Sequence, residues 1–150
     1  MIHYRPFLNS DPPAIAEIWR SQPPSKAIIQ TITPAVLDDL VYSRPFFDRQ
    51  GLIVAVQGDK PIGFVHAGFG PNAELSDLDH TNGTTALLLV SPHRDRNTIA
   101  RELLARSEQY LRERGATTLF GGATKMLAPF YLGLYGGSQL SGVLASDTVT

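Results

Sequence analysis

The segment "TTALLLVSPHRDRNTIARELL", residues 84–104, decides the fold of this chain. Its first half is a continuous apolar run bounded by turn residues, which predicts a strand buried on both faces of a sheet. Its second half begins a helix with apolar residues at helical spacing, and Gly115 is a natural C′ residue for that helix. The short strand "ATTLFGG" at 116–122 comes next. A strand, a helix and a second strand in this order predict a parallel pair joined by a right-handed crossover.

Two stretches nearer the N-terminus predict an antiparallel part of the sheet. "IHYRPF" at 2–7 alternates as a strand does. "GLIVAVQGDKPIGFVHAGFG" at 51–70 has two apolar segments on either side of a Gly-Asp turn, the pattern of a hairpin. The polar residues 71–83 are expected to form a loop before the buried strand.

Two helices are expected between the first strand and the hairpin, within 9–24 and 31–45. Asp11 and Thr33 are their expected N-cap residues, and a proline occupies the first helical position of each. Isoleucine, tryptophan, leucine and valine side chains fall on one face of each helix. Both helices therefore have an apolar face with which to cover a sheet.

A short apolar helix at 126–137 and a last strand at 138–146 are expected to end the chain. The element order then predicts an α/β fold, a central mixed β-sheet with helices on both faces. The 150 residues are expected to form a single domain, since this is an ordinary size for one domain.

Composition excludes several kinds of function. The net charge of −1 gives no global field that would recruit nucleic acid or an anionic membrane, so any anion site must be local. The absence of cysteine excludes disulfides, thiolate metal sites and a cysteine nucleophile, and the four scattered histidines suggest no metal site. No stretch has the roughly 20 apolar residues of a membrane span, and the N-terminus is unlike a signal peptide. A cytoplasmic location is the expectation.

The turn between the buried strand and the long helix is a candidate anion site. The first N–H groups of a helix lack partners, and the helix dipole favours an anion beside them. Arg94, Arg96 and Arg101 surround this end, which suggests a phosphate or pyrophosphate ligand. The alternative is that these arginines are merely exposed and that Asp95 or Asn97 caps the helix.

The element order, together with "LLLVSPHRDRNTIARELLARSEQYLRERGATTLFGG" at 87–122, resembles the GNAT superfamily of acyl-CoA-dependent N-acetyltransferases. The family signature after the fourth strand is Arg/Gln-x-x-Gly-x-Gly/Ala, and it falls on residues 95–100 here. Ala100 fits the last position, whereas Asp95 and Thr98 depart from it. A glycine lets the backbone approach a phosphate without a Cβ in between, and an aspartate adds an unfavourable charge unless an arginine pairs with it. Thr98 adds a branched side chain, although its hydroxyl can donate to a phosphate.

The resemblance implies that acetyl-CoA docks along the buried strand and the turn that follows it. Backbone groups of Leu89 and Val90, between strands expected to splay at 60–69 and 84–91, would hold the pantetheine arm. The pyrophosphate would lie at the helix start, and the implied cofactor-binding residues are Leu89, Val90, Asp95, Arg96, Asn97, Thr98, Ile99, Ala100 and Arg101.

The resemblance also implies two catalytic candidates. Phe130-Tyr131 matches the Phe-Tyr pair of many GNAT enzymes, whose tyrosine protonates the departing CoA thiolate; the alternative is a core tyrosine. His66, in the hairpin strand, is the candidate general base, and its alternative is a structural histidine. Acidic residues of the 71–83 loop lie on the solvated surface or face a cationic amine.

The implied function is transfer of an acetyl group from acetyl-CoA to a primary amine of a small-molecule or peptide acceptor. The alternative is a degenerate, non-catalytic GNAT-like domain, a structural or ligand-binding half of a larger protein. GNAT domains usually have one strand more after 138–146, so the single domain at 1–150 is expected to lack its last strand. "PFYLGLYGGS" also resembles N-terminal halves of tandem GNAT proteins, so a second GNAT domain or a homodimer would cover the open edge.

Overall fold

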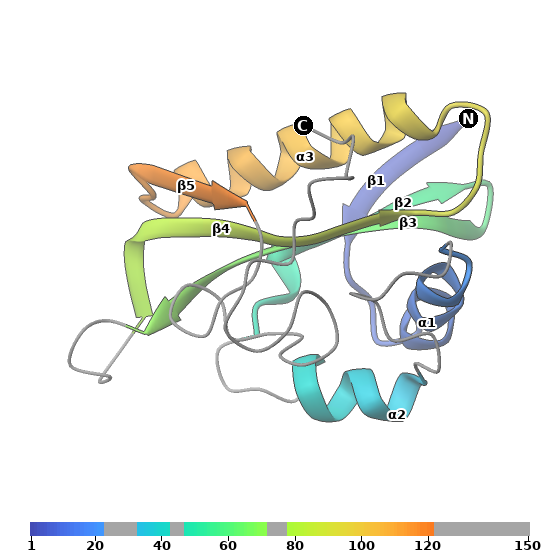
Figure 1. Cartoon of the computed structure of the whole chain (residues 1–150), viewed down its shortest axis with the longest axis horizontal. Coiled ribbons are helices and arrows are strands. Elements are labelled where there is room, and N and C mark those ends of the chain that lie inside the picture. The colour runs from blue at the N-terminus through green and yellow to red at the C-terminus, as the bar shows by residue number, and fades with distance from the viewer. Residues whose placement is uncertain (23–32, 43–46, 72–77, 122–150) are drawn as a thin grey trace.

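The computed structural model describes residues 1–22, 33–42, 47–71 and 78–121 (Figure 1). Its elements are β1 (Ile2–Pro6), α1 (Pro12–Arg20), α2 (Pro34–Leu37), the π-helical turn η1 (Asp38–Tyr42), the 3₁₀ turn η2 (Arg49–Gly51), β2 (Leu52–Gln57), β3 (Lys60–Pro71), β4 (Leu78–Val90), α3 (Arg96–Glu113) and β5 (Thr118–Gly121). The helix and strand expected at 126–137 and 138–146 lie outside the described residues.

The strands form one five-stranded sheet in the order β1-β2-β3-β4-β5. The first four strands are antiparallel neighbours, whereas β4 and β5 are parallel and are joined through α3. The predicted mixed sheet and its parallel crossover are therefore confirmed. A parallel pair needs such a long connection because the chain must return to the same end of the sheet.

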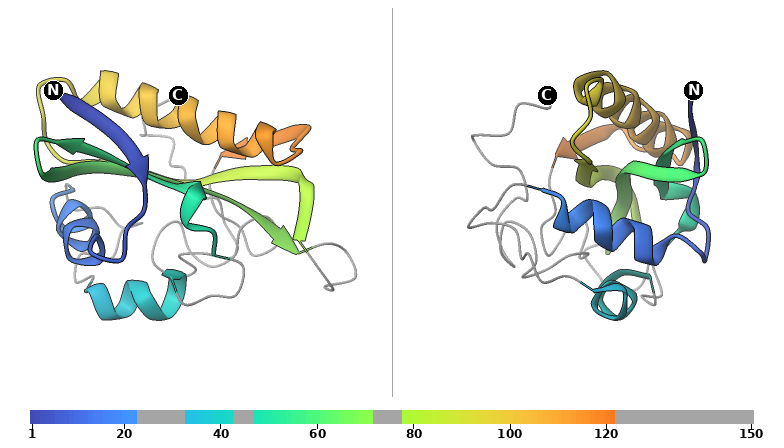
Figure 2. Two further views of the ribbon diagram at one scale, coloured as in Figure 1. Left: turned by 180° about the vertical axis from the view of Figure 1, so that it is seen from behind. Right: turned by 90° about the vertical axis from the view of Figure 1, so that its right-hand side faces the viewer.

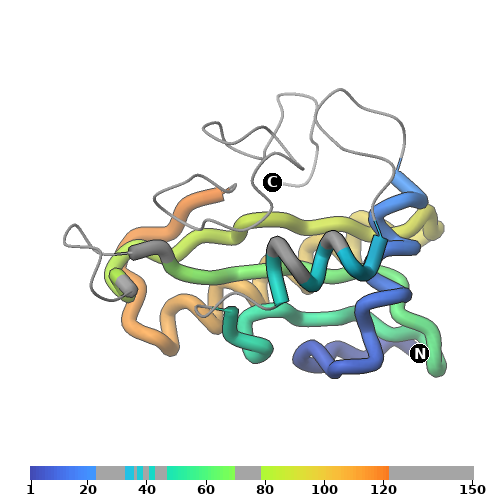
Figure 3. The backbone as a smooth tube through the Cα atoms, turned by 90° about the horizontal axis from the view of Figure 1, so that it is seen from below, coloured from blue at the N-terminus to red at the C-terminus, as the bar shows by residue number. Residues whose placement is uncertain are grey.

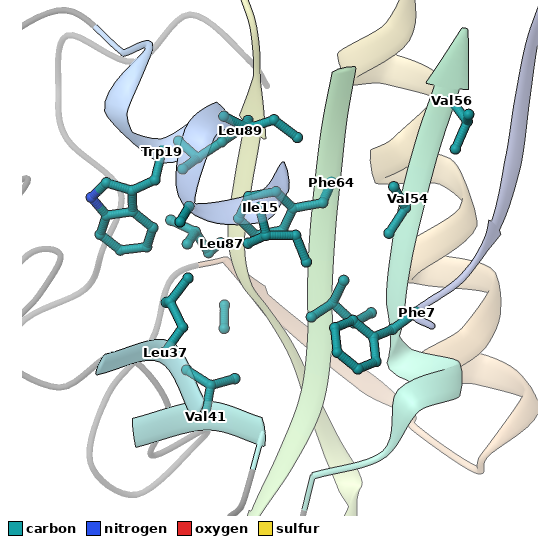
Figure 4. Close-up of a cluster of buried hydrophobic side chains, with 14 residues drawn as sticks. Phe7, Ile15, Trp19, Leu37, Val41, Val54, Val56, Phe64, Leu87 and Leu89 are labelled. Atoms are coloured by element: carbon teal, nitrogen blue, oxygen red, sulfur yellow. The ribbon is translucent and has the colours of Figure 1, made fainter. Parts of the chain in front are cut away.

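Helices cover both faces of this sheet, as predicted. Figure 2 shows α3 along one face, with α1 and α2 across the other, and Figure 3 shows α1 and α2 in front of the strands when seen from below. Side chains from α1, α2, β2, β3 and β4 converge in the cluster drawn in Figure 4, which includes Trp19 and Phe64, both completely buried. A second cluster lies between the sheet and α3.

Strand β4 contributes to both clusters. Leu87 and Leu89 belong to the cluster beneath α1 and α2, while Leu88 and Val90 pack in the cluster beneath α3. Successive side chains of a strand point to opposite faces, so burial on both sides requires apolar residues at every position. The continuous run of leucines is thus buried on both faces of the sheet, as its pattern predicts.

The expected loop at 71–83 is wrong for its second half, since β4 begins at Leu78. This end of β4 is only partly covered, so it carries polar residues. Such residues are typical of a loop, and the sequence pattern therefore did not indicate a strand here. Gly83 is required where the end of α3 crosses the strand, since a Cβ at this position would lie 2.8 Å from the Leu111 side chain. Pairing of β3 with β4 is irregular at Ala67, where residue Ala86 is skipped.

Gly115 follows the end of α3 and Gly58 lies in the turn between β2 and β3, both as predicted. Gly115 has φ of 105°, its N–H donates to the Arg112 carbonyl at 3.0 Å, and the Ala116 N–H donates to the Leu111 carbonyl at 3.0 Å. These two bonds form a Schellman motif, which satisfies carbonyls at the helix end. Gly58, with φ of 63°, begins the two-residue turn between β2 and β3.

Thr33 precedes α2 as expected, because the Leu37 N–H donates to its carbonyl at 3.2 Å. Asp11 precedes α1, but its predicted capping bond is wrong, since the side chain makes no hydrogen bond to that helix. The Asp11 carboxylate instead accepts two bonds from the Arg5 guanidinium, at 2.8 and 2.9 Å, and a third from the Leu8 N–H at 2.7 Å. A strong local partner on β1 thus replaces the cap and fixes α1 against the sheet edge.

Arg5→Met should lower the free energy of unfolding by about 3 kcal/mol, because it leaves the Asp11 carboxylate, 3% exposed, without a counter-charge. Urea denaturation of the two proteins measures the difference. Arg112→Met is the matched control, since its pair with Glu108 at 3.8 Å is solvent-exposed and should contribute about 0.5 kcal/mol or less. A loss below 1 kcal/mol for Arg5→Met would show that the pair is not a structural anchor.

Candidate functional site

The turn that joins β4 to α3 is pinned at both of its ends. The Ser91 N–H donates to the Ile62 carbonyl at 2.8 Å, the last bond between this chain segment and β3. His93 accepts the Asp95 N–H through Nδ1 at 3.0 Å, and its Nε2 lies 3.1 Å from Gln57 Oε1 at the end of β2. With Nδ1 accepting, Nε2 carries the proton and donates to Gln57. The hairpin and the helix start are therefore held together.

The first turn of α3 presents free backbone donors. The Arg96 N–H donates to the His93 carbonyl at 3.1 Å, and the Ile99 N–H donates to the Asp95 carbonyl at 3.0 Å. Within the described part of the chain, the N–H groups of Asn97 and Thr98 have no acceptor, and Asp95 makes no side-chain capping bond. Asp95 occupies the N-cap position, as the alternative expects, but its side chain does not cap the helix. Two donors at the positive end of a helix dipole suit an anion.

Arginines precede and follow these donors in the sequence. The Arg96 Nε donates to the Val90 carbonyl at 3.4 Å, and its terminal nitrogens make no hydrogen bond to any described residue. Arg94 lies 3.6 Å from the Asp95 carboxylate, with 90% of its own side chain exposed. This exposed pair partly balances the aspartate that departs from the family signature. Arg101 is exposed one turn further along α3.

The nine predicted cofactor residues lie at the end of β4 and at the start of α3, and they divide by burial. Ile99 and Ala100 are buried against the sheet, and the Ile99 N–H already donates to the Asp95 carbonyl. Asn97 and Thr98 are exposed. Because Thr98 lies within α3, its backbone is helical and the missing glycine causes no strain. Its side chain contributes a free hydroxyl among the described residues.

The expected splay between residues 60–69 and 84–91 is wrong. Strands β3 and β4 pair along their length, whereas β5 pairs only with residues 82–85 of β4. Figure 1 shows β5 beside one end of β4 only. The β5 side of β4 is therefore open beyond Thr85, within the described part of the chain.

Backbone groups of a strand alternate between its two edges. Because the Ser91 N–H faces β3, the backbone of Leu89 also faces β3 and that of Val90 faces the open edge. Of the two residues predicted to hold a pantetheine arm, only Val90 turns its main chain toward that edge, where its carbonyl accepts the Arg96 Nε at 3.4 Å.

Sequence reasoning missed a residue at this edge. Gln22, just beyond α1, is 6% exposed, and its Nε2 donates to the Val90 carbonyl at 3.0 Å. The contact joins residues 68 positions apart. A glutamine beside a proline pair resembles a surface loop, so no local signal could have found it.

His66 lies on β3 opposite Leu52 and Leu87, both members of the core cluster beneath α1 and α2. Its side chain therefore shares that face, and the Phe47 ring meets it edge-on at 5.5 Å. Burial lowers the pKa of His66 to about 3, against an opposing effect of the Asp48 carboxylate. The imidazole is accordingly neutral at physiological pH.

Asp48 links this region to α3. The Tyr110 hydroxyl donates to Asp48 Oδ2 at 2.7 Å, and Arg114 lies 3.5 Å from the same oxygen. Burial and the bond to Asp48 raise the pKa of Tyr110, so it stays a protonated donor. The contacts fix the turn η2 beneath the last turns of the helix.

The other catalytic candidate, Tyr131, lies outside the described residues together with Phe130. Asp79 of the acidic segment is described, and hydrogen bonds from Thr81 and Asn82 lower its pKa. In the described ranges no group of three histidine, aspartate or glutamate side chains could hold a metal ion. No described helix combines the length and apolar character needed to cross a membrane.

Known structures share this arrangement of elements. N-acetylglutamate synthase from Neisseria gonorrhoeae, complexed with coenzyme A and N-acetyl-glutamate, matches 81% of this chain with a TM-score of 0.59 and 17% identity. The chain spans only 25% of the length of that synthase. No curated protein matches the chain in sequence.

Two shorter Brucella melitensis proteins are similar over most of their length. A ribosomal-protein-alanine N-acetyltransferase has a TM-score of 0.57 and 17% identity, with 82% of this chain and 80% of that protein covered. A GNAT family acetyltransferase in complex with acetyl-CoA has a TM-score of 0.58 and 17% identity, with 79% and 73% covered. At such identity these structures show a shared fold alone.

The sequence itself carries a more direct assignment. The profile of the acetyltransferase (GNAT) family matches residues 13–129, well over half of the chain. This match runs from α1 through β4 and α3, the elements that form the open strand edge and the candidate anion site. The chain belongs to the acetyltransferase (GNAT) family.

Proposed function

We propose that this protein is an N-acetyltransferase that moves an acetyl group from acetyl-CoA to a primary amine of a small-molecule or peptide acceptor. One observation carries the proposal: at the end of β4, on the edge that no described strand covers, the N–H groups of Asn97 and Thr98 follow Arg96 and have no acceptor among the described residues. Family membership supports it, as do similar structures that contain coenzyme A or acetyl-CoA.

The pyrophosphate would occupy the first turn of α3. The two free N–H groups, the Thr98 hydroxyl and the Arg96 terminal nitrogens are its donors, with Arg94 and Arg101 adding positive charge. Charge-assisted hydrogen bonds of this kind are short and strong, which compensates for a side chain where the family has glycine. The pantetheine arm would extend from there along the open edge, past Val90.

The reaction needs two proton transfers. The amine nitrogen attacks the thioester carbonyl, a C–N bond forms, the C–S bond breaks, and the amine proton leaves to a base or to water. Tyr131 is the proposed acid that returns a proton to the thiolate, because the ordinary pKa values of a phenol and a thiol are close.

His66 stays a prediction as the base, and its burial weighs against that role. An imidazole whose conjugate acid has a pKa of about 3 takes a proton poorly from an alkylammonium, whose ordinary pKa is near 10. An acceptor that binds already neutral would remove the difficulty.

The degenerate, non-catalytic domain is the second candidate. The Asp95 carboxylate beside the helix start favours it, because this charge opposes that of a pyrophosphate and only the exposed Arg94 partly balances it. The catalytic candidate must bind acetyl-CoA, whereas the non-catalytic candidate need not, so a measurement of cofactor binding distinguishes the two.

Acetyl-CoA titrated into the purified chain should bind in the micromolar range, and Arg96→Glu should weaken binding by 10-fold or more, because it reverses a charge at the pyrophosphate site. Isothermal titration calorimetry measures both constants. Arg112→Glu, at the far end of α3, is the matched control and should stay within about 2-fold. A folded wild-type protein that gives no heat at millimolar acetyl-CoA would support the non-catalytic candidate instead.

Tyr131→Phe should lower kcat by about 100-fold or more with little change in acetyl-CoA affinity, because only the proton donor is lost. Thiol release from acetyl-CoA, followed with a panel of primary amines, measures the rate. Tyr135→Phe, four residues further along the sequence, serves as the control. Equal rates for the wild type and Tyr131→Phe would exclude the hydroxyl from the chemistry.

The ring signals of His66 should not titrate between pH 5 and 8 in an NMR experiment, given a pKa of about 3. Only the unfolded chain takes up this proton as the pH falls from about 6.5 towards 3, so the folded state loses stability over that window, by up to about 1.4 kcal/mol per pH unit. His66→Gln should reduce this slope. A titration midpoint near 6.5 would instead restore His66 as a base.

A further inference from the structure

The carboxamide of Gln22 occupies a buried position between α1 and β4. Its Nε2 donates to the Val90 carbonyl at 3.0 Å and to the Ile18 carbonyl, in the last turn of α1, at 3.1 Å. The Ser21 hydroxyl is a further neighbour, at 3.4 Å. Both N–H protons of the amide are thus donated in hydrogen bonds, one to a carbonyl of α1 and one to a carbonyl of β4.

The Val90 carbonyl already has two donors. Besides Gln22, the Arg96 Nε approaches it at 3.4 Å. A carbonyl oxygen has two lone pairs, so a third donor must replace one of these two. The 3.4 Å contact belongs to a side chain of the anion site, whereas Gln22 belongs to the opposite face of the sheet.

This carbonyl lies on the part of β4 that β5 does not pair with. An extended ligand that adds to such an edge donates an amide N–H to each outward-facing carbonyl. Gln22 therefore makes the hydrogen bond that the neighbouring strand, or a strand-like ligand, would make. A primary amide is the side chain that best imitates a peptide group here.

We propose that Gln22 belongs to the cofactor site and holds the position of a ligand amide at Val90, from which it is displaced when a ligand with an amide-bearing arm binds. The proposal rests on the proposed function, since the pantetheine arm of coenzyme A, with two secondary amides, is that ligand. Displacement releases the end of α1 from β4.

The affinity for coenzyme A therefore contains the cost of removing Gln22. Gln22→Met keeps the length and volume of the side chain but cannot donate a hydrogen bond. This variant should bind coenzyme A about 5-fold more tightly, the factor that corresponds to one net hydrogen bond. ADP carrying a 3′-phosphate lacks the amide arm, and its affinity should stay within about 2-fold.

Calorimetry on the full chain measures the ratio of the two affinities in the wild type, in Gln22→Met and in the exposed control Gln109→Met. Gln22→Asn, whose amide is one methylene shorter, is the second variant, and circular dichroism confirms that each protein is folded. The side-chain amide signal of Gln22 in the wild type should move on addition of coenzyme A and stay unchanged with the ADP fragment.

The outcomes are distinct. A wild type that binds neither ligand overturns the proposed function and this inference with it. A wild type that binds both, with the same affinity ratio as Gln22→Met and Gln22→Asn, overturns only the role of Gln22. A ratio that falls in the variants, because they bind coenzyme A less well, would make Gln22 a ligand contact that stays in place.

Discussion

Burial of β4 on both faces is the constraint on which the rest of the structure depends. Its leucines alternate between the cluster beneath α1 and α2 and the cluster beneath α3, so one strand joins the two halves of the core. Each fully buried leucine contributes roughly 2 kcal/mol by leaving water. The leucine segment of this strand packs against apolar side chains on both of its faces, and the chain turns where the strand ends. The candidate site lies at one of these ends.

The same strand gives the site its two parts. Beyond residues 82–85, β4 does not pair with β5, so among the described residues the backbone of Val90 faces an edge that no strand covers. The immediate passage into α3 leaves the N–H groups of Asn97 and Thr98 without acceptors in the described chain. Donors for an anion and an edge for an extended arm are thus arranged along one line. This arrangement suits a ligand with a phosphate end and a long amide-containing arm.

The departures from the family signature have different weights in this geometry. Thr98 is helical and exposed. The loss of phosphate affinity that its side chain causes therefore depends only on how closely the phosphate must approach the backbone. The Asp95 carboxylate repels a bound pyrophosphate. The exposed Arg94 reduces this repulsion only in part, since ion pairs between exposed side chains are well solvated. Arg96, held by the Val90 carbonyl through Nε, keeps its terminal nitrogens for a ligand.

The sequence by itself determined the elements whose signals are local. The leucine run, the helix period of 96–113, the Schellman glycine Gly115 and the Gly58 turn each follow from the preferences of neighbouring residues. The family resemblance also predicts an anion site at the start of that helix, where the N–H groups of Asn97 and Thr98 have no acceptor among the described residues. The tertiary structure alone decided which edge of β4 is open, that Asp11 pairs with Arg5 rather than capping α1, how deeply His66 is buried, and that Gln22 reaches Val90. These features join segments far apart in the chain, and their geometry depends on strand register and helix packing, which form only when the whole core assembles.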